Sequence, residues 1–180
     1  MRTIQTARLR LVPVTVGNAQ ELWDVLRQPH LRDYQDLPSV DLAHLRRMIE
    51  GRPRRLIPGA FGRFEWLVCA VDEPGSIGWV SLRMNDRDAG AAEIGYSIIV
   101  ERRGRGLATE AAQALIEEAF ERVDITTVRA YCVPENAASR AVLMKIGFVP
   151  DGRLRNGATV GGQPVDVEAF MLTRGRGKPS

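Results

Sequence analysis

The alternation of apolar and polar residues predicts a chain in which strands and helices follow one another. Residues 8–14 (RLRLVPV) change between polar and apolar at nearly every position, which is typical of a strand with one buried face. Residues 166–173 (DVEAFMLT) alternate in the same way, and further strands are predicted at 64–71, 76–84, 92–100, 126–133 and 148–149. Apolar residues spaced three or four apart predict helices at 18–27, from Ser39 onward, at 104–123 and at 136–146. This order indicates a mixed α/β fold on one sheet.

Glycine and proline mark the connections between these elements. The turn 72–75 (DEPG) predicts a hairpin between the strands on either side of it. Gly147 stands where a helix commonly ends, and Ser39 is a suitable N-cap for the helix that follows it. Residues 153–164 (RLRNGATVGGQP) are rich in glycine and predict a long hairpin loop.

Length and composition predict one domain. A chain of 180 residues with 44% hydrophobic content can bury its own core, and we expect it to span residues 1–173, with 174–180 as a flexible basic tail. There is no apolar run of membrane-spanning length and no signal segment at Met1, which predicts a cytoplasmic protein without membrane association. Arginine outnumbers lysine 23 to 2, which suggests a bacterial source.

The net charge of +3 changes this picture little. Arg174, Arg176 and Lys178 lie in the tail, and the 22 remaining basic residues equal the 22 acidic ones. A neutral body argues against nucleic acid as the partner.

Cysteine and histidine do not predict a metal site. Cys69 and Cys132 lack the paired spacing of zinc or redox ligands, so we expect reduced core residues. His30 and His44 have no second ligand at a useful spacing, and no metal is predicted.

The candidate chemistry is concentrated where the strand 92–100 leads into the helix 104–123. The turn between them reads ERRGRG at 101–106. The first N–H groups of a helix have no intrahelical partner and lie at the positive end of its dipole. Gly104 and Gly106 allow close approach to the backbone, and Arg102, Arg103 and Arg105 add positive charge. The stretch therefore predicts an anion site.

Three kinds of phosphate site compete for this turn. A P-loop requires Lys followed by Ser or Thr after its second glycine, whereas Leu107 and Ala108 stand here. A dinucleotide fingerprint requires Gly or Ala at Thr109 and an acidic residue near Asp124, and both requirements are poorly met. A cradle for the pyrophosphate of coenzyme A fits better. On this stretch alone, a solvated basic turn remains an open alternative.

Two segments resemble the GNAT superfamily of N-acetyltransferases. Residues 101–106, followed by LATEA, are similar to its motif Q/R-x-x-G-x-G/A, although Glu101 replaces Gln or Arg. Residues 134–148 (PENAASRAVLMKIGF) resemble the subgroup that acetylates the N-termini of ribosomal proteins, with Asn136, Ser139, an aliphatic residue in a position often held by Tyr, and a final Lys-x-Gly-Phe. The segment 6–11 (TARLRL) is also similar to that subgroup. The resemblance covers nearly the whole chain.

The resemblance implies a fold and a cosubstrate. The implied sheet is single, mostly antiparallel and made of about seven strands, splayed between 92–100 and 126–133, with helices on both faces. Acetyl-CoA is the implied cosubstrate, with Asn136 bonded to its pantetheine arm. Its other implied contacts are Ile98, Ile99, Val100, Arg102, Arg103, Gly104, Arg105, Gly106, Leu107, Ala108 and Thr109.

The resemblance also implies the catalytic residues. Glu93 matches a strand glutamate that acts as general base, and its neighbours Ile94, Tyr96 and Ile98 are expected to desolvate it. Ser139 takes the role of the acid that protonates the leaving thiolate, directly or through water. Backbone N–H groups of residues 98–100 are expected to stabilise the oxyanion. Each has a structural alternative: an ion pair for Glu93, the first helical turn for Ser139, and an N-cap for Asn136.

The acceptor is less defined. The implied acceptor site lies between residues 28–58 and the loop 155–164, with Asp33, Tyr34 and Asp36 as candidate contacts to an ammonium group. We expect transfer to a primary amine, a protein or peptide N-terminal α-amine, by direct attack in a ternary complex. Alternatives are acetylation of an aminoglycoside or polyamine, and a non-catalytic module that binds CoA or the ribosome. Both monomer and homodimer remain open.

Overall fold

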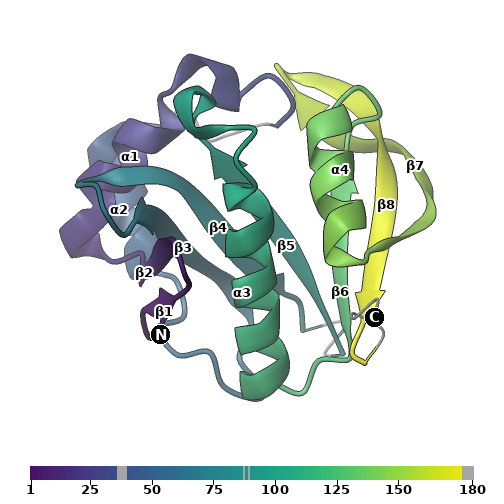
Figure 1. Cartoon of the computed structure of the whole chain (residues 1–180), viewed down its shortest axis with the longest axis horizontal. Coiled ribbons are helices and arrows are strands. Elements are labelled where there is room, and N and C mark those ends of the chain that lie inside the picture. The colour runs from purple at the N-terminus through teal and green to yellow at the C-terminus, as the bar shows by residue number, and fades with distance from the viewer. Residues whose placement is uncertain (36–39, 87, 89, 176–180) are drawn as a thin grey trace.

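The computed structural model describes residues 1–35, 40–86, 88 and 90–175, which form one eight-stranded sheet with helices on both faces (Figure 1). The strands are β1 (Ile4–Gln5), β2 (Leu9–Pro13), β3 (Gly62–Ala70), β4 (Ser76–Met84), β5 (Ala91–Ile98), β6 (Thr127–Cys132), β7 (Val149–Val160) and β8 (Gln163–Thr173). The α-helices are α1 (Ala19–Leu26), α2 (Leu42–Glu50), α3 (Leu107–Arg122) and α4 (Ala137–Ile146). Three 3₁₀ turns are η1 (Val16–Asn18), η2 (Pro29–Leu31) and η3 (Val100–Arg102).

The strand order is β1-β2-β3-β4-β5-β6-β8-β7, and every neighbouring pair except β5 and β6 is antiparallel. The mixed, mostly antiparallel sheet is therefore confirmed. It has eight strands where about seven were predicted, because β1 has only two residues, too few to show a period.

The strands β5 and β6 are splayed, as predicted. They pair from Ala91 opposite Thr127 to Glu93 opposite Arg129, and no further. Beyond this point the two strands diverge, and the gap between them widens toward the N-terminal end of α3 (Figure 1). We call this opening the β5/β6 gap.

Alternating side chains divide the sheet between two cores. Trp66, Leu82 and Ile94 are buried on the face that is covered by α3 and α4. Leu67 and Trp79 are buried on the opposite face, against α1 and α2. Position along a strand therefore decides on which face a side chain lies.

The helix after the basic turn starts later than predicted. It begins at Leu107 rather than at 104, because Gly104 and Gly106 both have φ of +75°. This left-handed conformation does not continue into a right-handed helix, so both glycines belong to the turn.

The prediction of a loop at 153–164 is wrong. Residues 153–160 belong to β7 and residues 163–164 to β8, and the chain turns between them at Gly161 and Gly162 with φ of +56° and +78°. Strand β7 is exposed along most of its length, so it shows no apolar alternation, and backbone pairing with β8 defines it. A Cβ at Gly157 would lie 2.5 Å from Val167 Cγ2, so the hairpin requires glycine at that position.

Two further predictions concern the ends of elements. Ser39 and Asp36 lie outside the described residues. Helix α2 is capped by Asp41, whose Oδ1 accepts the N–H of His44 at 2.7 Å. At the other end of the chain, Arg174 donates its N–H to Thr126 O at 2.8 Å. Within the described residues, no helix is both long enough and apolar enough to cross a membrane.

Candidate active site

The turn between β5 and α3 has the backbone of an anion site. Gly104 and Gly106 adopt the left-handed conformation, which residues with a side chain rarely reach. Apart from chain neighbours, no heavy atom of the described residues lies within 4 Å of the position that a Cβ on Gly104 would take. The outer side of the turn is therefore open to a ligand that approaches the backbone.

The first turn of α3 supplies free donors to the same place. The first hydrogen bond of the helix runs from Glu110 N–H to Gly106 O, at 3.1 Å. The N–H groups of Leu107, Ala108 and Thr109 precede it and have no intrahelical partner. Together with the positive end of the helix dipole, these groups favour a phosphate. This position was predicted for the pyrophosphate of coenzyme A.

The three arginines of the turn differ in their contacts. Arg102 forms an ion pair with Glu73. Arg103 donates from Nε to Ile98 O at 3.0 Å, which ties the turn to the end of β5. Arg105 is exposed, and its guanidinium makes no hydrogen bond to a described residue. Arg102 and Arg103 thus brace the turn, whereas Arg105 is available for direct contact with an anion.

A second cluster of charges supports this turn. Glu110 Oε1 accepts from Thr6 Oγ1 at 2.6 Å and from Arg8 N–H at 3.0 Å, and Arg8 Nε donates to Glu110 Oε2 at 2.7 Å. Arg8 Nη1 also donates to Arg105 O at 3.0 Å. Burial raises the pKa of Glu110, but the hydrogen bonds from Thr6 and Arg8 outweigh burial and leave its pKa below the ordinary value. Glu110 is therefore ionised, and Arg8 compensates its charge beside the anion site.

The β5/β6 gap exposes backbone groups of β5. Ile99 N–H donates to Ile77 O at 2.9 Å, on the side of β4. Because N–H groups alternate in direction along a strand, those of Tyr96 and Ile98 point into the gap. Ile98 can thus serve as the predicted oxyanion donor. The prediction is wrong for Ile99, because its N–H donates to Ile77 O of β4. Val100 is the first residue of the turn η3 and no longer belongs to the strand.

Helix α4 forms the other side of this gap. Asn136 Oδ1 accepts Ser139 N–H at 3.0 Å, which confirms the structural alternative of an N-cap. Ser139 Oγ lies 3.1 Å from Tyr96 Oη, and Ser139 O lies 3.3 Å from the same phenol oxygen. Leu143, one turn further along α4, is buried. A hydroxyl pair, Tyr96 and Ser139, therefore bridges β5 and α4.

The surroundings of Tyr96 keep its phenol neutral. Burial raises its pKa, the hydrogen bond with Ser139 lowers it, and the nearby Cys132 raises it, so that the pKa is about 12. At neutral pH the phenol is therefore a hydrogen-bond donor. The sequence predicts for Tyr96 only the role of an apolar neighbour of Glu93. No local pattern indicates that it contacts Ser139, which is 43 residues further along the chain.

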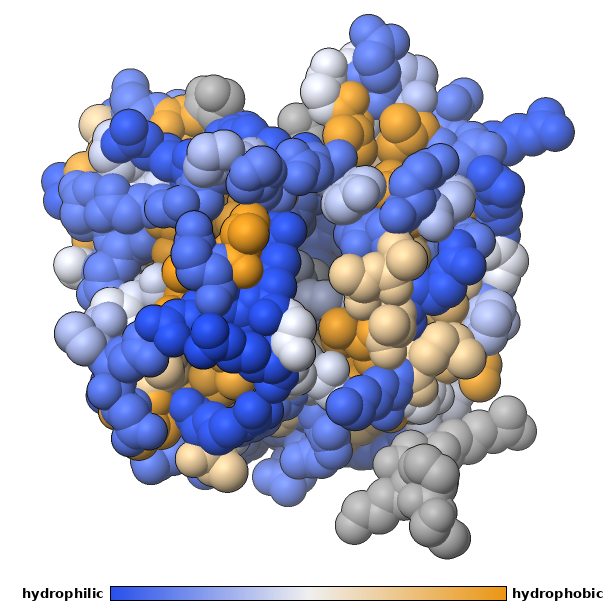
Figure 2. Space-filling view, turned by 45° about the horizontal axis from the view of Figure 1, so that its top comes forward, coloured by the Kyte–Doolittle hydropathy of each residue, from blue (hydrophilic) through white to orange (hydrophobic). Residues whose placement is uncertain are grey.

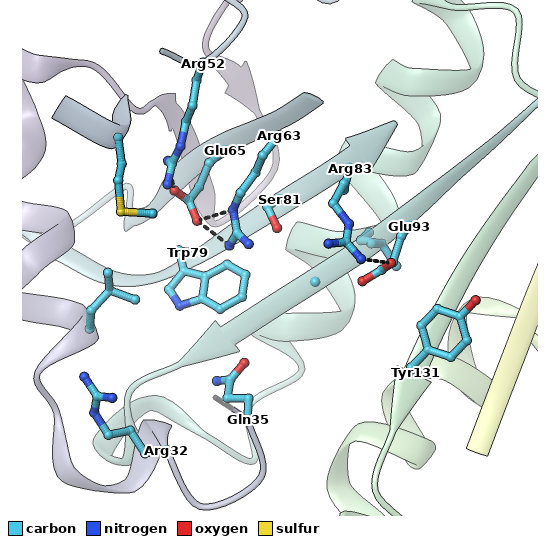
Figure 3. A pocket seen from close by; sticks show the side chains of 14 residues that line it. Arg32, Gln35, Arg52, Arg63, Glu65, Trp79, Ser81, Arg83, Glu93 and Tyr131 are labelled. Carbon is cyan, nitrogen blue, oxygen red and sulfur yellow. Dashed lines mark hydrogen bonds and ion pairs between the residues drawn. The ribbon is translucent and has the colours of Figure 1, made fainter. Parts of the chain in front are cut away.

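A polar cavity opens on the opposite face of the sheet. It measures about 660 Å³ and lies between the sheet and the α1/α2 region (Figure 3). It reaches the β5/β6 gap, because both β5 and β6 contribute to its wall. The side chains that define its polar character are Glu65, Ser81, Arg63, Arg83, Glu93 and Tyr131.

Glu93 lies in this cavity and not among apolar residues. Ile94, Tyr96 and Ile98 are partners in the core on the α3 face, so Glu93, at alternate position, faces α1 and α2. Its Oε2 lies 2.8 Å from Arg83 Nη2, and 37% of its side chain is exposed. The expected desolvation by apolar neighbours is therefore wrong, and the ion-pair alternative is confirmed.

The predicted acceptor region is only partly in the right place. Arg32, Gln35 and Arg52, from the stretch 28–58, line the cavity. Among the described residues that line it, none comes from 155–164, which belongs to the β7/β8 hairpin. Asp33 and Tyr34 are exposed side chains outside this lining, and Asp36 is not among the described residues.

Comparison with known proteins identifies the family. Residues 8–149 match the acetyltransferase (GNAT) domain. The chain is a member of the GNAT acetyltransferase family. It is 31% identical over 175 residues to the uncharacterized N-acetyltransferase p20 of Bacillus licheniformis, covering 97% of each chain. Two solved structures show the same fold. The ribosomal-protein-S5-alanine acetyltransferase of Vibrio fischeri has a TM-score of 0.83 at 20% identity, with 99% and 100% coverage. RimL, a ribosomal L7/L12 alpha-N-protein acetyltransferase solved with coenzyme A, has a TM-score of 0.82 at 21% identity, with 96% and 98% coverage.

Family membership makes this GNAT protein an acetyl-CoA-dependent N-acetyltransferase. Its own residues fit that cosubstrate, since the open turn at Gly104 and the free N–H groups of α3 suit a pyrophosphate. A view toward the wide end of the β5/β6 gap shows a hollow between the two halves of the molecule, with hydrophilic residues predominating on one side of it (Figure 2).

Proposed function

We propose that this protein acetylates a protein or peptide N-terminal α-amine, by direct attack of the amine in a ternary complex. The observation that carries the proposal is the position of Glu93. It lies in the polar cavity beside the β5/β6 gap, whereas the anion site and Ser139 lie at the gap on the other side of the sheet. An acceptor in the cavity and a thioester in the gap would therefore meet at β5.

The general base in this proposal is Glu93. An amine is mostly protonated near neutral pH, because its ordinary pKa is about 8 for an N-terminus and about 10 for lysine. It must lose a proton before it attacks. Glu93 is the carboxylate on β5 at the gap, and it accepts that proton directly or through water.

In this proposal, α4 supplies the group that protonates the leaving sulfur, and β5 supplies the N–H that stabilises the oxyanion. Bound acetyl-CoA supplies an activated thioester carbonyl. The N–H of Ile98 points into the gap and is placed to stabilise an oxyanion there. The Ser139 hydroxyl, held by Tyr96 at 3.1 Å, donates a proton to the leaving sulfur as it takes up another from solvent.

A peptide is favoured over a polyamine by the charges of the cavity. Arg52, Arg63 and Arg83 line it together with Glu65 and Glu93, and each carboxylate is already in an ion pair. A polycation such as spermidine or an aminoglycoside would meet arginines that repel it. RimL and the S5-alanine acetyltransferase, which share the fold, are named as protein acetyltransferases, and this agrees with the proposal.

The test is a direct assay of acceptors. The purified protein is incubated with acetyl-CoA and with peptides that have a free or a blocked N-terminus, and both thiol release and peptide mass are measured. We expect acetylation of the free α-amine only. Acetylation of spermidine or kanamycin at higher kcat/KM than any peptide would overturn the peptide proposal.

The Glu93 assignment is tested with Glu93→Gln, which keeps the size of the side chain. We expect kcat to fall by about 100-fold, a usual contribution of a general base, with little change in the Kd of acetyl-CoA. The matched control is Glu121→Gln, at an exposed position on α3. Equal loss in both variants would remove Glu93 from the mechanism.

A further inference from the structure

A row of charged residues crosses the sheet along the wall of the polar cavity. Arg63 on β3 stands directly opposite Arg83 on β4, and Arg83 stands directly opposite Glu93 on β5. All three line the cavity (Figure 3). Like charges at directly opposed positions of two strands weaken a sheet. Glu65 and Glu93 offset part of the repulsion between Arg63 and Arg83. An anionic ligand between the two guanidinium groups would offset it further.

Glu65, next to this row, has ion pairs at both of its carboxylate oxygens. Glu65 is 2% exposed, and Arg63 donates to its Oε1 from Nη2 at 2.7 Å and from Nε at 3.2 Å. Arg52 forms an ion pair with its Oε2. Two guanidinium groups thus share one buried carboxylate. This trio carries one net positive charge at the wall of the cavity.

Arg63 and Arg83 line the cavity and keep N–H groups that their bonds to Glu65 and Glu93 do not use. Arg63 is 39% exposed and Arg83 is 64% exposed. Arg83 gives only Nη2 to Glu93. Arg63 lies over the ring of Trp79, 5.2 Å from its centroid, and its two bonds to Glu65 restrict the orientation of the guanidinium. A planar guanidinium with unused N–H groups is the side chain best suited to bind a carboxylate.

From these contacts we infer that the acceptor carries a carboxylate close to its amine and that Arg63 and Arg83 bind it. The inference rests on the proposed function, in which the acceptor is a peptide N-terminus, and it specifies one with acidic side chains directly after the first residue. Binding of that carboxylate to Arg83 replaces Glu93 as its partner. Glu93 then becomes free to receive the ammonium group of the same acceptor and to take its proton.

The experiment compares peptides that differ only after their first residue. Three synthetic peptides begin with Ser followed by two Glu, two Gln or two Lys, and kcat/KM is measured for each. We expect the Glu peptide to exceed the Gln peptide by about tenfold or more, in the range of a charge-assisted hydrogen bond, and the Lys peptide to be poorest. The preference falls as salt increases, because the bound charges are partly exposed.

Variants connect this preference to the arginines. Arg83→Gln reduces the Glu-over-Gln ratio toward one, and so does Arg63→Lys, which keeps the charge but loses the planar fork. Arg10→Gln removes an equal charge at an exposed position outside the cavity and keeps the ratio of the wild type. Because the readout is a ratio of two substrates on one protein, a general loss of activity does not alter it.

The outcomes separate the two claims. If no peptide is acetylated while a small amine is, the proposed function is wrong. If peptides are acetylated without preference for Glu, or with the same ratio in Arg83→Gln and Arg63→Lys as in the wild type, the peptide function holds and the acidic specificity is overturned.

Discussion

The hydroxyl groups of Tyr96 and Ser139 lie 3.1 Å apart and join β5 to α4 where the sheet is splayed. The phenol stays neutral far above physiological pH, since its pKa is about 12. It therefore orients the serine hydroxyl by a hydrogen bond rather than by charge. A proton donor needs such a fixed partner, because a freely rotating serine hydroxyl samples several directions.

The first prediction concerns the kinetics of this pair. We expect Ser139→Ala to lower kcat by about 100-fold, because the acid is lost. We expect Tyr96→Phe to lower kcat by about tenfold, because the acid is no longer held in place. The Kd of acetyl-CoA changes little in either variant. In the double variant, the loss equals that of Ser139→Ala alone, because residues that act as one unit are not additive.

The control for this cycle is Tyr34→Phe, which removes an exposed phenol outside the cavity. Single-turnover rates at saturating acetyl-CoA isolate the chemical step. Independent, additive losses in the double variant would show that Tyr96 does not act through Ser139.

The second prediction follows from the raised pKa of Tyr96. An unfolded tyrosine ionises near pH 10, whereas Tyr96 in the folded protein ionises near 12, so the folded state binds more protons between these values. Stability linked to Tyr96 is present below pH 10 and is lost as pH rises from 10 to 12. Two pKa units correspond to about 2.7 kcal/mol, so the free energy of unfolding declines by roughly 2 to 3 kcal/mol over this window.

Urea unfolding at closely spaced alkaline pH values measures this decline. In Tyr96→Phe the part due to Tyr96 disappears, and the curve is flatter by about the same 2 to 3 kcal/mol. If the free energy of unfolding depended on alkaline pH in the same way in wild type and variant, burial would not raise the pKa of Tyr96.

The third prediction concerns the glycine turn. Gly104 and Gly75 have similar conformations, with φ of +75° and +84°, and a Cβ at either position would meet nothing within 4 Å. Substitution by Val therefore strains both turns similarly, by roughly 1 to 2 kcal/mol. We expect only Gly104→Val to weaken acetyl-CoA binding, by about tenfold or more, because its side chain occupies the side where phosphate approaches.

Calorimetric titration with acetyl-CoA gives the Kd, and urea unfolding gives the strain. Gly75→Val is the matched control, since it lies in the β3/β4 turn. If Gly104→Val bound acetyl-CoA as tightly as Gly75→Val, the pyrophosphate would have to be placed elsewhere.

The sequence predicts the central part of the fold well and its edges poorly. Strands β3 and β4 are buried on both faces and therefore read as apolar segments bounded by a turn, and α3 shows a clear repeat because one face of it is buried. Strand β7 is exposed on both sides for most of its length, so no pattern distinguishes it from a loop. Its pairing with β8 is a long-range backbone effect that no local pattern reports.

The candidate site shows the same limit. The anion turn is local, so the two glycines and the helix start can be found from the sequence. Tyr96 and Ser139 are 43 residues apart and meet through the packing of α4 beside β5. The contact between Glu93 and Arg83 depends on the register of β4 and β5. Glu65 is a charged residue in an otherwise apolar strand, and such positions are the feature of the sequence that could have predicted a polar cavity. No cavity was predicted from it.

The last prediction concerns Arg8, which the sequence placed only in a strand. Arg8 compensates the charge of Glu110 in the first turn of α3 and also donates to Arg105 O at 3.0 Å. In Arg8→Gln, an ionised Glu110 remains without its cation beside the pyrophosphate position. We expect the Kd of acetyl-CoA to rise by about tenfold at low salt, since two like charges then lie close together. Adding Glu110→Gln removes that charge and restores most of the affinity. Calorimetric titrations at two salt concentrations measure both effects, and a double variant that binds as weakly as Arg8→Gln would show that Arg8 acts through the Arg105 carbonyl instead.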